Sequence, residues 1–324
     1  MRWIRSLSVI ALVLACAAAP ASAQAWPERP VRILVPFPGG GAADAVVRLV
    51  ANHLARALGQ TVVIDNRPGG NTVIAADAAA KAAPDGYTLL VSSASTMVSN
   101  PVLFAGRLPY DPERDFRPVG VVSRLPFFVI ASAKVPVRDL QEFLALARAR
   151  PGQLGYATNG NGTAGHIGTE LLKRAAGIDL LHVPYRSYAH ALPDLVAGRI
   201  AVAMADLTVF GGALQAGEAK ALAVAAPDRS PFLPDVPTMA EEGFPGFDAS
   251  VWFGMFAPAR TPTEMVARLN AELRTYLASE EARTAFAGIS QVPAASSPEE
   301  LRALVRADAD RYGRIIREAR ITVD

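Results

Sequence analysis

Short β-rich runs alternate with helical patterns along most of this 324-residue chain, and this order constrains the fold more than any other feature. Residues 31–35, 61–65 and 87–93 are expected to be strands, with helical apolar spacing between them. A second series of the same kind runs through residues 139–225. Because such an order is typical of parallel sheets covered by helices, the sequence predicts an α/β fold with two lobes.

Two further apolar runs are candidates for strands that cross from one lobe to the other. One covers residues 121–132 and contains Pro126, and the other covers residues 251–257 after a loop-rich stretch. The chain is long enough for two lobes, each with its own core. We expect lobe I to comprise residues 24–123 and 250–324, and lobe II to comprise residues 124–249.

Three short sequences predict where helices begin. Asp139 followed by Glu142 fits a capping box, in which each side chain accepts a hydrogen bond from the backbone N–H of the other residue. Residues 261–264 (Thr-Pro-Thr-Glu) and 297–300 (Ser-Pro-Glu-Glu) each place a hydroxyl cap before a proline, with glutamate at the third helical position. The C-terminal part of the chain is therefore expected to be helical.

The first 23 residues have the form of a secretory signal peptide. Arg2 and Arg5 precede an apolar run over residues 7–19, and Ala-Ser-Ala occupies residues 21–23. The run is shorter than the roughly 20 residues that span a bilayer. We expect an exported, soluble, periplasmic protein; the alternative is lipidation at Cys16, the only cysteine. Removal of this segment leaves no thiol for a disulfide, redox chemistry or a thiolate metal site.

The charge balance argues against nucleic acid or an anionic membrane surface as a partner. The chain has 32 Lys and Arg against 30 Asp and Glu, and both Arg2 and Arg5 lie in the segment expected to be removed. The remaining charges balance, and no basic stripe is clustered along the sequence. Such a chain offers no electrostatic attraction for phosphate backbones.

A glycine-rich loop follows the first expected strand and precedes a helix. It runs from Pro36 to Asp44, and its three consecutive glycines expose backbone N–H groups at the positive end of the helix, which favours anions. The loop lacks the third glycine of a dinucleotide fingerprint, and no Gly-Lys-Ser/Thr follows for a nucleotide P-loop. The alternative is a tight turn with Asp44 in the first helical turn.

A second loop of the same kind, from Asn159 to Gly165, also lies between a strand and a helix. If each lobe contributes one such loop at the carboxyl end of its sheet, both loops face the cleft where open α/β sheets bind ligands. Two facing helix N-termini can hold one carboxylate. The pair therefore predicts a binding cleft between the lobes.

Three further residues are candidates for the same cleft. His166 lies about one turn into the helix expected to begin near Thr163, and could direct a ring nitrogen into the cleft or serve only as a structural hydrogen-bonding group. Asp206 follows a strand and could face the cleft, cap the next helix, or do both. Tyr185 could line the cleft or belong to the core.

Residues suited to catalysis or metal binding are few. The four histidines show no pair at metal-ligand spacing on a common face, and no Gly-x-Ser-x-Gly motif is present. Ser92, Ser93 and Ser95 follow a strand, but nothing in the sequence marks one of them as a nucleophile. We expect that the protein is not an enzyme and that it binds no metal and no organic cofactor. The alternative, an exported hydrolase with a cleft serine, predicts turnover of the ligand.

Several motifs occur in a fixed order from about residue 26 to the C-terminus. They are Pro-Phe-Pro-Gly-Gly at 36–40, Asp44 with Arg48, Asn-Arg-Pro-Gly at 66–69, Pro-Asp-Gly-Tyr at 84–87, His-Val-Pro-Tyr-Arg at 182–186, Leu-Pro-Asp-Val-Pro-Thr at 233–238, Pro-Gly-Phe at 245–247, Trp-Phe-Gly at 252–254 and Ala-Pro at 257–258. Their joint order resembles the periplasmic solute-binding receptors of tripartite tricarboxylate transporters, the Bordetella uptake (Bug) family.

The resemblance implies a periplasmic-binding-protein fold of type II, a two-lobed Venus flytrap with two interdomain crossings that closes around a small organic carboxylate. The implied ligands are dicarboxylates, tricarboxylates, acidic amino acids and aromatic acids, held largely by the backbone of the two glycine loops and by water. A membrane permease with one large and one small subunit is the implied partner, and we expect a monomer. Delivery of the ligand-bound form to a membrane sensor kinase stays open as an alternative.

Carried over by position, the resemblance implies a cleft made by the two loops and the strand end near Ser93 and Ser95. The chain departs from the family at two positions, because Ala43 stands where many relatives have Thr, and Ser187 where many have Gly. The ligand can therefore differ from those of close relatives. The expected ligand-binding residues are Phe37, Pro38, Gly39, Gly40, Gly41, Ala42, Ala43, Asp44, Ser93, Ser95, Gly160, Asn161, Gly162, Thr163, Ala164, His166, Tyr185 and Asp206.

Overall fold

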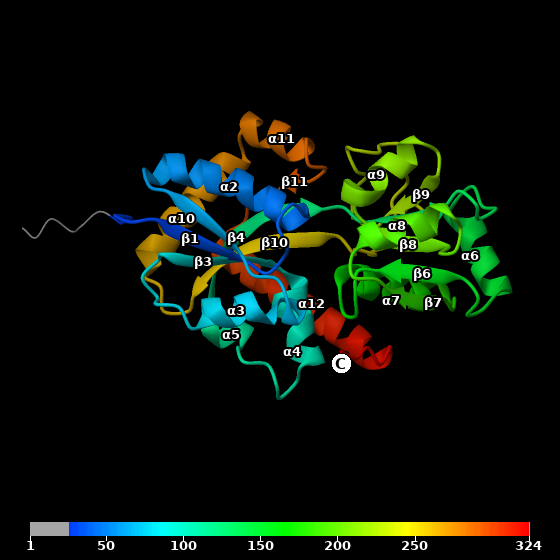
Figure 1. Cartoon of the computed structure of the whole chain (residues 1–324), viewed down its shortest axis with the longest axis horizontal. Helices are drawn as coiled ribbons and strands as arrows, with labels where there is room; N and C mark the ends of the chain where they lie inside the picture. The colour runs from blue at the N-terminus through cyan, green and yellow to red at the C-terminus, as the bar shows by residue number, and fades with distance from the viewer. Residues whose placement is uncertain (1–25, 324) are drawn as a thin grey trace, which may run out of the picture.

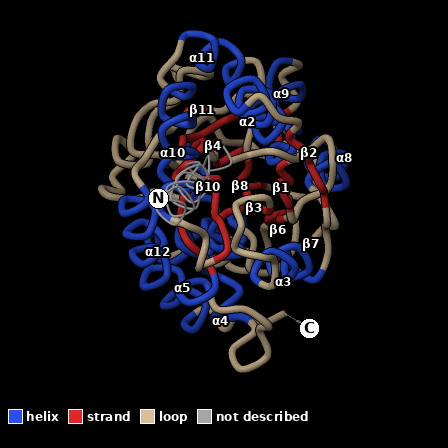
Figure 2. Tube along the Cα trace, turned by 90° about the vertical axis from the view of Figure 1, so that its left-hand side faces the viewer, coloured by secondary structure: helices blue, strands red, loops and turns tan. Residues whose placement is uncertain are grey.

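The computed structural model describes residues 26–323, which form two α/β lobes side by side (Figure 1). The predicted signal peptide, with Cys16, lies outside the described residues. Each lobe is built around one sheet, and a view along the long axis shows strands inside and helices around them (Figure 2). The predicted α/β fold with two lobes is confirmed. No helix among the described residues is both long enough and apolar enough to span a membrane.

Lobe I contains a six-stranded mixed sheet with the order β11-β4-β10-β3-β1-β2. β1 runs parallel to β2 and β3, whereas β10 runs antiparallel to β3 and β4, and β11 antiparallel to β4. The adjacent residues Ile33 and Leu34 pack into different apolar clusters on the two faces, as the period of a strand requires. The bounds are β1 Val31–Val35, β2 Val62–Asn66, β3 Thr88–Ser93, β4 Phe116–Leu125, β10 Val251–Pro258 and β11 Val292–Pro293.

Helices cover both faces of the lobe I sheet. α2, α10 and α11 pack on one face, and α3, η2 and α12 on the other. α2 has the predicted 3.6-residue period, because Val46, Val50 and Leu54 are fully buried, and it ends at Gly59, whose φ of 67° is left-handed. The bounds are α2 Ala42–Leu58, η1 Gly70–Thr72, α3 Val73–Ala80, η2 Ser95–Ser99, α4 Asn100–Leu103, α5 Pro112–Asp115, α10 Thr263–Leu277, α11 Glu280–Ala287 and α12 Pro298–Glu318.

Lobe II contains a five-stranded mixed sheet with the order β7-β6-β8-β5-β9. β6 runs parallel to β7 and β8, and β5 runs antiparallel to β8 and β9. α6 and α7 pack on one face, and α8 and α9 on the other. The bounds are β5 Phe128–Ser132, α6 Leu140–Ala149, β6 Gly155–Thr158, α7 Ala164–Ala176, β7 Leu181–Pro184, α8 Tyr188–Val196, β8 Val202–Ala205, α9 Leu207–Gln215 and β9 Ala219–Val224.

The chain crosses between the lobes twice. The apolar run at 121–132, interpreted above as one strand, is two strands in different sheets, because Pro126 lacks an N–H and lies between the end of β4 and the start of β5. The return crossing leads from β9 into β10. We propose the lobe limits 123/124 and 249/250: β4 extends two residues beyond the first limit, and β10 begins at Val251, just after the second.

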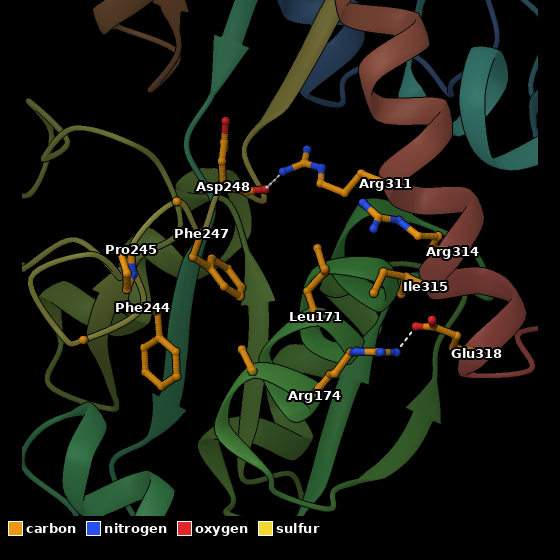
Figure 3. Close-up of a pocket in the computed structure, with 13 residues that line it drawn as sticks. Leu171, Arg174, Phe244, Pro245, Phe247, Asp248, Arg311, Arg314, Ile315 and Glu318 are labelled. Carbon is orange, nitrogen blue, oxygen red and sulfur yellow. Dashed lines mark hydrogen bonds and ion pairs between the residues drawn. The ribbon is translucent and has the colours of Figure 1, made fainter.

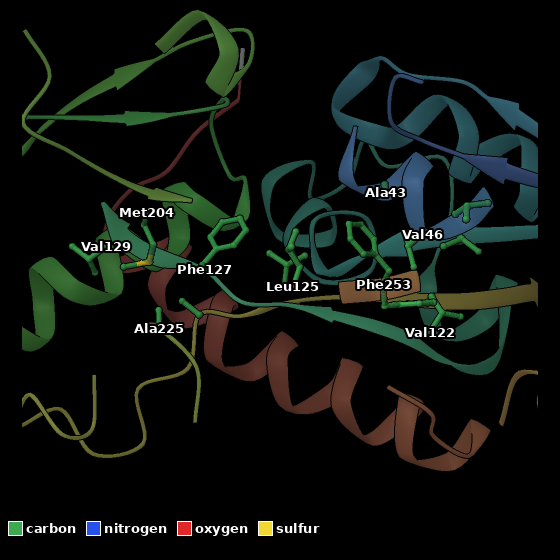
Figure 4. Close-up of a cluster of buried hydrophobic side chains, with 14 of the residues drawn as sticks. Ala43, Val46, Val122, Leu125, Phe127, Val129, Met204, Ala225 and Phe253 are labelled. Carbon is green, nitrogen blue, oxygen red and sulfur yellow. The ribbon is translucent and has the colours of Figure 1, made fainter. Parts of the chain in front are cut away.

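One apolar cluster continues from lobe I into lobe II through the crossing segments (Figure 4). Leu125 and Phe127 flank the break between β4 and β5 and are 3% and 5% exposed. Phe253 of β10 packs beside them from the return crossing. The junction between the lobes is therefore held by apolar side chains from both crossing segments.

The predicted cap of the last helix is confirmed, and that of α10 is wrong. Ser297 and Glu300 form the reciprocal bonds of a capping box at the start of α12. In α10, by contrast, Pro262 occupies the capping position and no side chain caps the helix. Thr261 is fully buried, and its hydroxyl has no hydrogen-bond partner among the described residues. The helix start thus lies one residue beyond the expected cap, although the same hydroxyl-proline pair caps α12.

The capping box predicted at α6 is half formed. Asp139 accepts a hydrogen bond from the backbone N–H of Glu142 at 2.8 Å, as expected. The Glu142 carboxylate, however, accepts from the backbone N–H of Arg138 at 2.8 Å and also pairs with the Arg138 guanidinium. The Glu142 carboxylate is thus bound to Arg138, the residue before the cap, and does not form the second hydrogen bond of the capping box.

Candidate ligand-binding cleft

A cavity of about 270 Å³ lies between the lobes, where the crossing strands meet the N-terminal ends of several helices. Lobe I and the crossings contribute Phe37, Pro38, Gly41, Ala42, Ala43, Asn71, Thr72, Ser93, Ser95, Leu125, Phe127, Val251 and Phe253 to its lining. Lobe II contributes Asn159, Thr163, Ala164, Ser187, Tyr188, Ala189, Asp206, Thr208 and Val209. The two glycine-rich loops therefore reach one shared space.

The structure brings part of the predicted set to this cavity. Predicted residues that line it are Phe37, Pro38, Gly41, Ala42, Ala43, Ser93, Ser95, Thr163, Ala164 and Asp206. Predicted residues that do not line it are Gly39, Gly40, Asp44, Gly160, Asn161, Gly162, His166 and Tyr185. Within the second group, Asp44 and His166 are buried and accept hydrogen bonds from the backbone of their loops, whereas Gly39 and Gly40 are exposed. Ligand contact by any of these residues stays a prediction.

The first glycine loop leads into α2 at the cavity. Gly41 is the N-cap residue, and no side chain caps this helix end. Asp44 is 2% exposed; its carboxylate accepts from the backbone N–H of Gly40 at 2.9 Å and from Arg48 Nε at 2.8 Å. Burial raises the pKa of Asp44, but these hydrogen bonds outweigh it and leave the pKa below its usual value. Asp44 is thus an ionised residue that shapes the loop.

The second loop leads into α7 in the same way. Thr163 is the N-cap residue, but its hydroxyl donates to the carbonyl of Gly160 at 2.8 Å and does not cap the helix. His166 accepts at Nδ1 from the Gly162 N–H at 3.1 Å and stacks on His182 with 3.9 Å between ring centroids. Burial, followed by repulsion from His182, lowers the pKa of His166 to about 3. The ring is therefore neutral, in the structural role named above.

A third helix end lies at the cavity; the sequence predicts a helix from Ser187 and Tyr188 as a possible cleft residue, but it does not assign this helix end to the cleft. α8 begins after Ser187, and Ser187, Tyr188 and Ala189 all line the cavity. Ser187 does not cap the helix, because its hydroxyl bonds to His190 Nδ1 at 2.8 Å. Tyr188 donates its hydroxyl to the Met204 carbonyl at 2.7 Å. No glycine marks this loop, so the glycine signal used for the other two loops could not find it.

Asp206 combines the two roles considered for it. It lines the cavity, and its Oδ1 accepts from the Thr208 N–H at 2.7 Å, which caps α9. It contributes the only carboxylate to the lining, and no Lys, Arg or His side chain from the described part of the chain reaches the cavity. Any anion bound here must therefore be held by N–H and hydroxyl groups.

Asn71 and Thr72 form a wall of the cavity that the sequence did not indicate. Both have left-handed backbones, with φ of 50° and 75°, which is uncommon outside glycine and costs most for a β-branched residue. Asn100 holds both: its amide donates to the Asn71 carbonyl at 2.7 Å and to Thr72 Oγ1 at 3.1 Å. Strained backbone held by a buried side chain is common at functional sites.

Within residues 26–323, no cluster of three or more His, Cys, Asp and Glu side chains could hold a metal ion. The cavity between the lobes is the candidate site because three uncapped helix ends, one carboxylate and the polar residues Asn71 and Thr72 line it.

Comparison with solved structures finds similar folds. The structure titled "R. palustris Rpa4515 with adipate" is 36% identical, with a TM-score of 0.83 over 92% of this chain and 99% of that chain. "MatC (Rpa3494) from Rhodopseudomonas palustris with bound malate" is 34% identical, with a TM-score of 0.78 over 90% and 100% of the two chains. These likenesses confirm the expected receptor fold.

The sequence comparisons agree. Protein BugT of Bordetella pertussis is 36% identical over 320 residues, which cover 98% of each chain. Residues 46–321 match the family described as "Tripartite tricarboxylate transporter family receptor". The resemblance stated from the sequence motifs is thereby confirmed, and the chain belongs to the Bug-type receptor family of tripartite tricarboxylate transporters.

Proposed function

We propose that this chain is a periplasmic receptor that binds a small organic carboxylate between its lobes and delivers it to a two-subunit membrane permease. The observation that carries the proposal is the convergence of the uncapped N-termini of α2, α7 and α8 on one cavity. Backbone N–H groups at such ends attract anions. Adipate and malate, the molecules named for two similar structures, belong to the same chemical class.

The apolar residues of the cavity lining suit an apolar carbon skeleton. Phe37 and Phe253 meet edge to face with 6.0 Å between ring centroids, and Leu125, Val209 and Val251 also line the cavity. A densely hydroxylated acid would leave its hydroxyl groups unpaired against these side chains. We therefore favour acids with an aliphatic chain or a ring over polyhydroxylated ones.

Lobe closure would complete the site. The α2 end belongs to lobe I, and the α7 and α8 ends belong to lobe II, so an open form presents only part of the binding groups. A ligand that bridges the lobes stabilises the closed form by its differential affinity for that form. The permease would then recognise the closed receptor.

The surroundings of the cleft serines support a receptor over a hydrolase. The Ser92 hydroxyl bonds to Thr96 Oγ1, which bonds to Thr72 Oγ1 at 2.8 Å, so it is engaged in a buried polar network. Ser93 and Ser95 line the cavity, but none of its lining residues is a histidine that could act as a general base. Binding without chemistry is therefore the function that this cavity supports best.

A thermal-shift screen of the refolded, ligand-free mature chain tests the proposal. Each acid is paired with its neutral amide, because the two share a skeleton and differ in charge. At 100 times its dissociation constant, a ligand adds about 2.7 kcal/mol, which raises the Tm of a chain of this size by about 4 °C. A shift with an acid and none with its amide supports carboxylate recognition. Equal shifts with both, or product formation from an ester, would contradict it.

Export and delivery need tests in cells. Mass spectrometry of a periplasmic extract should find the chain without its first 23 residues. Deletion of the chain should abolish uptake of the acid identified in the screen while the permease is still present. Normal uptake with loss of a transcriptional response to the acid would instead favour the sensor-kinase alternative.

A further inference from the structure

A second cavity, of about 610 Å³, lies between α7, the segment at 243–248 and α12 (Figure 3). No residue lines both this groove and the cleft. α7 connects the two: Ala164 lies at the cleft, and Arg174, in the groove, lies ten residues or roughly 15 Å farther along the helix. The walls of the groove come from both lobes, because α12 packs with lobe I and the other two elements belong to lobe II.

Three arginines line the groove, and two of them are paired with carboxylates. Arg311 is fixed, since it donates to Asp308 Oδ1 at 2.8 Å and to the backbone carbonyl of Asp248. Arg174 forms an ion pair with Glu318 across the lobes. Arg314 is exposed and forms no ion pair with any residue in the described part of the chain; its guanidinium lies between Arg311 and Ile315 in Figure 3.

The floor of the groove is apolar. Leu171 of α7 and Ile315 of α12 face each other across it, and Phe244 and Phe247 form the far side. Ile315 is 7% exposed, whereas Leu171 and the two phenylalanines are half-buried and so keep apolar surface open to the groove. An occupant that covers this surface gains free energy from removing it from water.

We propose that this groove is a second binding site, for an amphipathic monocarboxylate. The guanidinium of Arg314 matches the two oxygens of a carboxylate, and the apolar floor matches a ring or chain attached to it. Arg311 is paired with Asp308 and Arg174 with Glu318, so Arg314 is the one arginine of the groove without a carboxylate partner in the described part of the chain. A single unpaired guanidinium, with the Asp248 carboxylate also in the lining, favours a monoanion over a dicarboxylate. The site does not depend on the proposed function of the cleft.

Methyl NMR with phenylacetate as the probe tests this site separately from the cleft. Ile315 is the one isoleucine that lines the groove, and no isoleucine of the described chain lines the cleft. Val209 and Val251 line the cleft, and no valine lines the groove. Labelling isoleucine and valine methyl groups in the mature chain therefore reports on the two sites separately, and Ile315→Val assigns the groove signal.

Phenylacetate should shift the Ile315 methyl resonance in a saturable manner, with phenylacetamide and acetate each binding at least about tenfold more weakly, because one lacks the charge and the other the ring. Arg314→Gln should weaken binding by about tenfold or more. Arg317→Gln is the matched control, since Arg317 lies on the same exposed helix end but outside the groove lining, and it should change the affinity by less than about twofold.

Three results would overturn the site. Phenylacetate could leave Ile315 unshifted while it shifts Val209 and Val251, which would support the cleft and reject the groove. The Ile315 shift could survive Arg314→Gln unchanged, which would show apolar contact without carboxylate recognition. The neutral amide could bind as well as the acid. A shift at Ile315 alone would support the groove and count against phenylacetate as a cleft ligand.

Discussion

Replacing Asn100 with alanine should loosen one wall of the cleft and also destabilise the chain. Asn100 is fully buried at the start of α4. Its amide donates to the Asn71 carbonyl, Thr72 Oγ1 and the Tyr110 hydroxyl, and its Oδ1 accepts from Asn71 Nδ2 at 2.9 Å. These bonds hold Asn71 and Thr72 in left-handed backbone conformations that face the cavity.

The magnitude follows from the deleted bonds. The two amide hydrogens of Asn100 are shared among three acceptors and count as two hydrogen bonds, and the bond that its Oδ1 accepts is a third. At about 1 kcal/mol net for each bond, Asn100→Ala should lower the free energy of unfolding by about 3 kcal/mol. For a folded part of about 300 residues this lowers the Tm by about 5 °C. A left-handed non-glycine residue costs about 1–3 kcal/mol, so without Asn100 the backbone of Asn71 and Thr72 should relax. A wall displaced in this way should weaken ligand binding about tenfold, or about 1.4 kcal/mol.

Asn270→Ala is the matched control. Asn270 is 8% exposed and donates to the carbonyls of Val119 and Ser296, both at 2.7 Å, away from the cavity lining. It should lose about 2 kcal/mol of stability and keep its affinity for ligand. Calorimetric titration of both variants with the acid found in the screen, below their Tm, compares them directly. Equal affinity in the two variants would show that Asn100 supports the fold and does not position the wall.

Four other substitutions have defined outcomes. Asp206→Asn removes the carboxylate from the cavity, and asparagine can still cap α9, so the Tm should not change. Calorimetry should show that an anion binds about threefold to tenfold more tightly. Weaker binding would mean that Asp206 accepts a hydrogen bond from the ligand. The pKa of His166 is about 3, lowered by burial and then by Coulombic repulsion. The unfolded chain therefore takes up a proton that the folded chain excludes, and the free energy of unfolding should fall as pH drops from about 6.5, by about 2 kcal/mol at pH 5. Denaturant titrations should show a smaller pH dependence in His166→Asn. A Cβ at Gly165 would lie 1.8 Å from the Tyr188 hydroxyl oxygen, so Gly165→Ala should lower the free energy of unfolding by about 3 kcal/mol. A Cβ at Gly212 would have no atom within 4 Å, so Gly212→Ala should raise the free energy of unfolding by up to about 1 kcal/mol. Thermal denaturation of the two variants checks both values.

Local apolar periodicity was enough to predict most strands and helices. β1 is a run of β-branched and aliphatic residues, and α2 repeats its apolar residues every three or four positions, so the pattern fixed both. The break at Pro126 was harder, because its flanking residues are apolar on both sides and both strands are buried. Only the pairing partners, β10 on one side and β8 with β9 on the other, distinguish two strands from one.

The glycine signal found two of the three uncapped helix ends. Glycine allows loop conformations that other residues avoid, but any helix N-terminus exposes N–H groups. A glycine-rich loop can therefore indicate an uncapped helix end, but such an end does not require glycine. Serine is a favoured N-cap residue, so the sequence alone indicates that Ser187 caps its helix. In the structure its hydroxyl instead forms a hydrogen bond with His190, and residue type alone does not predict that partner. Asn71 and Thr72 were missed for a related reason, because their left-handed backbones depend on Asn100, which is 28 or 29 residues away.

On the proposed function, a cleft built from helix ends suits a receptor that must also release its ligand. Removing one partner of a buried ion pair costs about 3–5 kcal/mol, so a cleft arginine would resist separation from its anion. A helix end contributes only about 0.3–1 kcal/mol of charge interaction beyond its hydrogen bonds. The binding groups are also divided, with the α2 end in lobe I and the α7 and α8 ends in lobe II. In the proposed open form no single group would keep the anion, so opening alone would be sufficient for release.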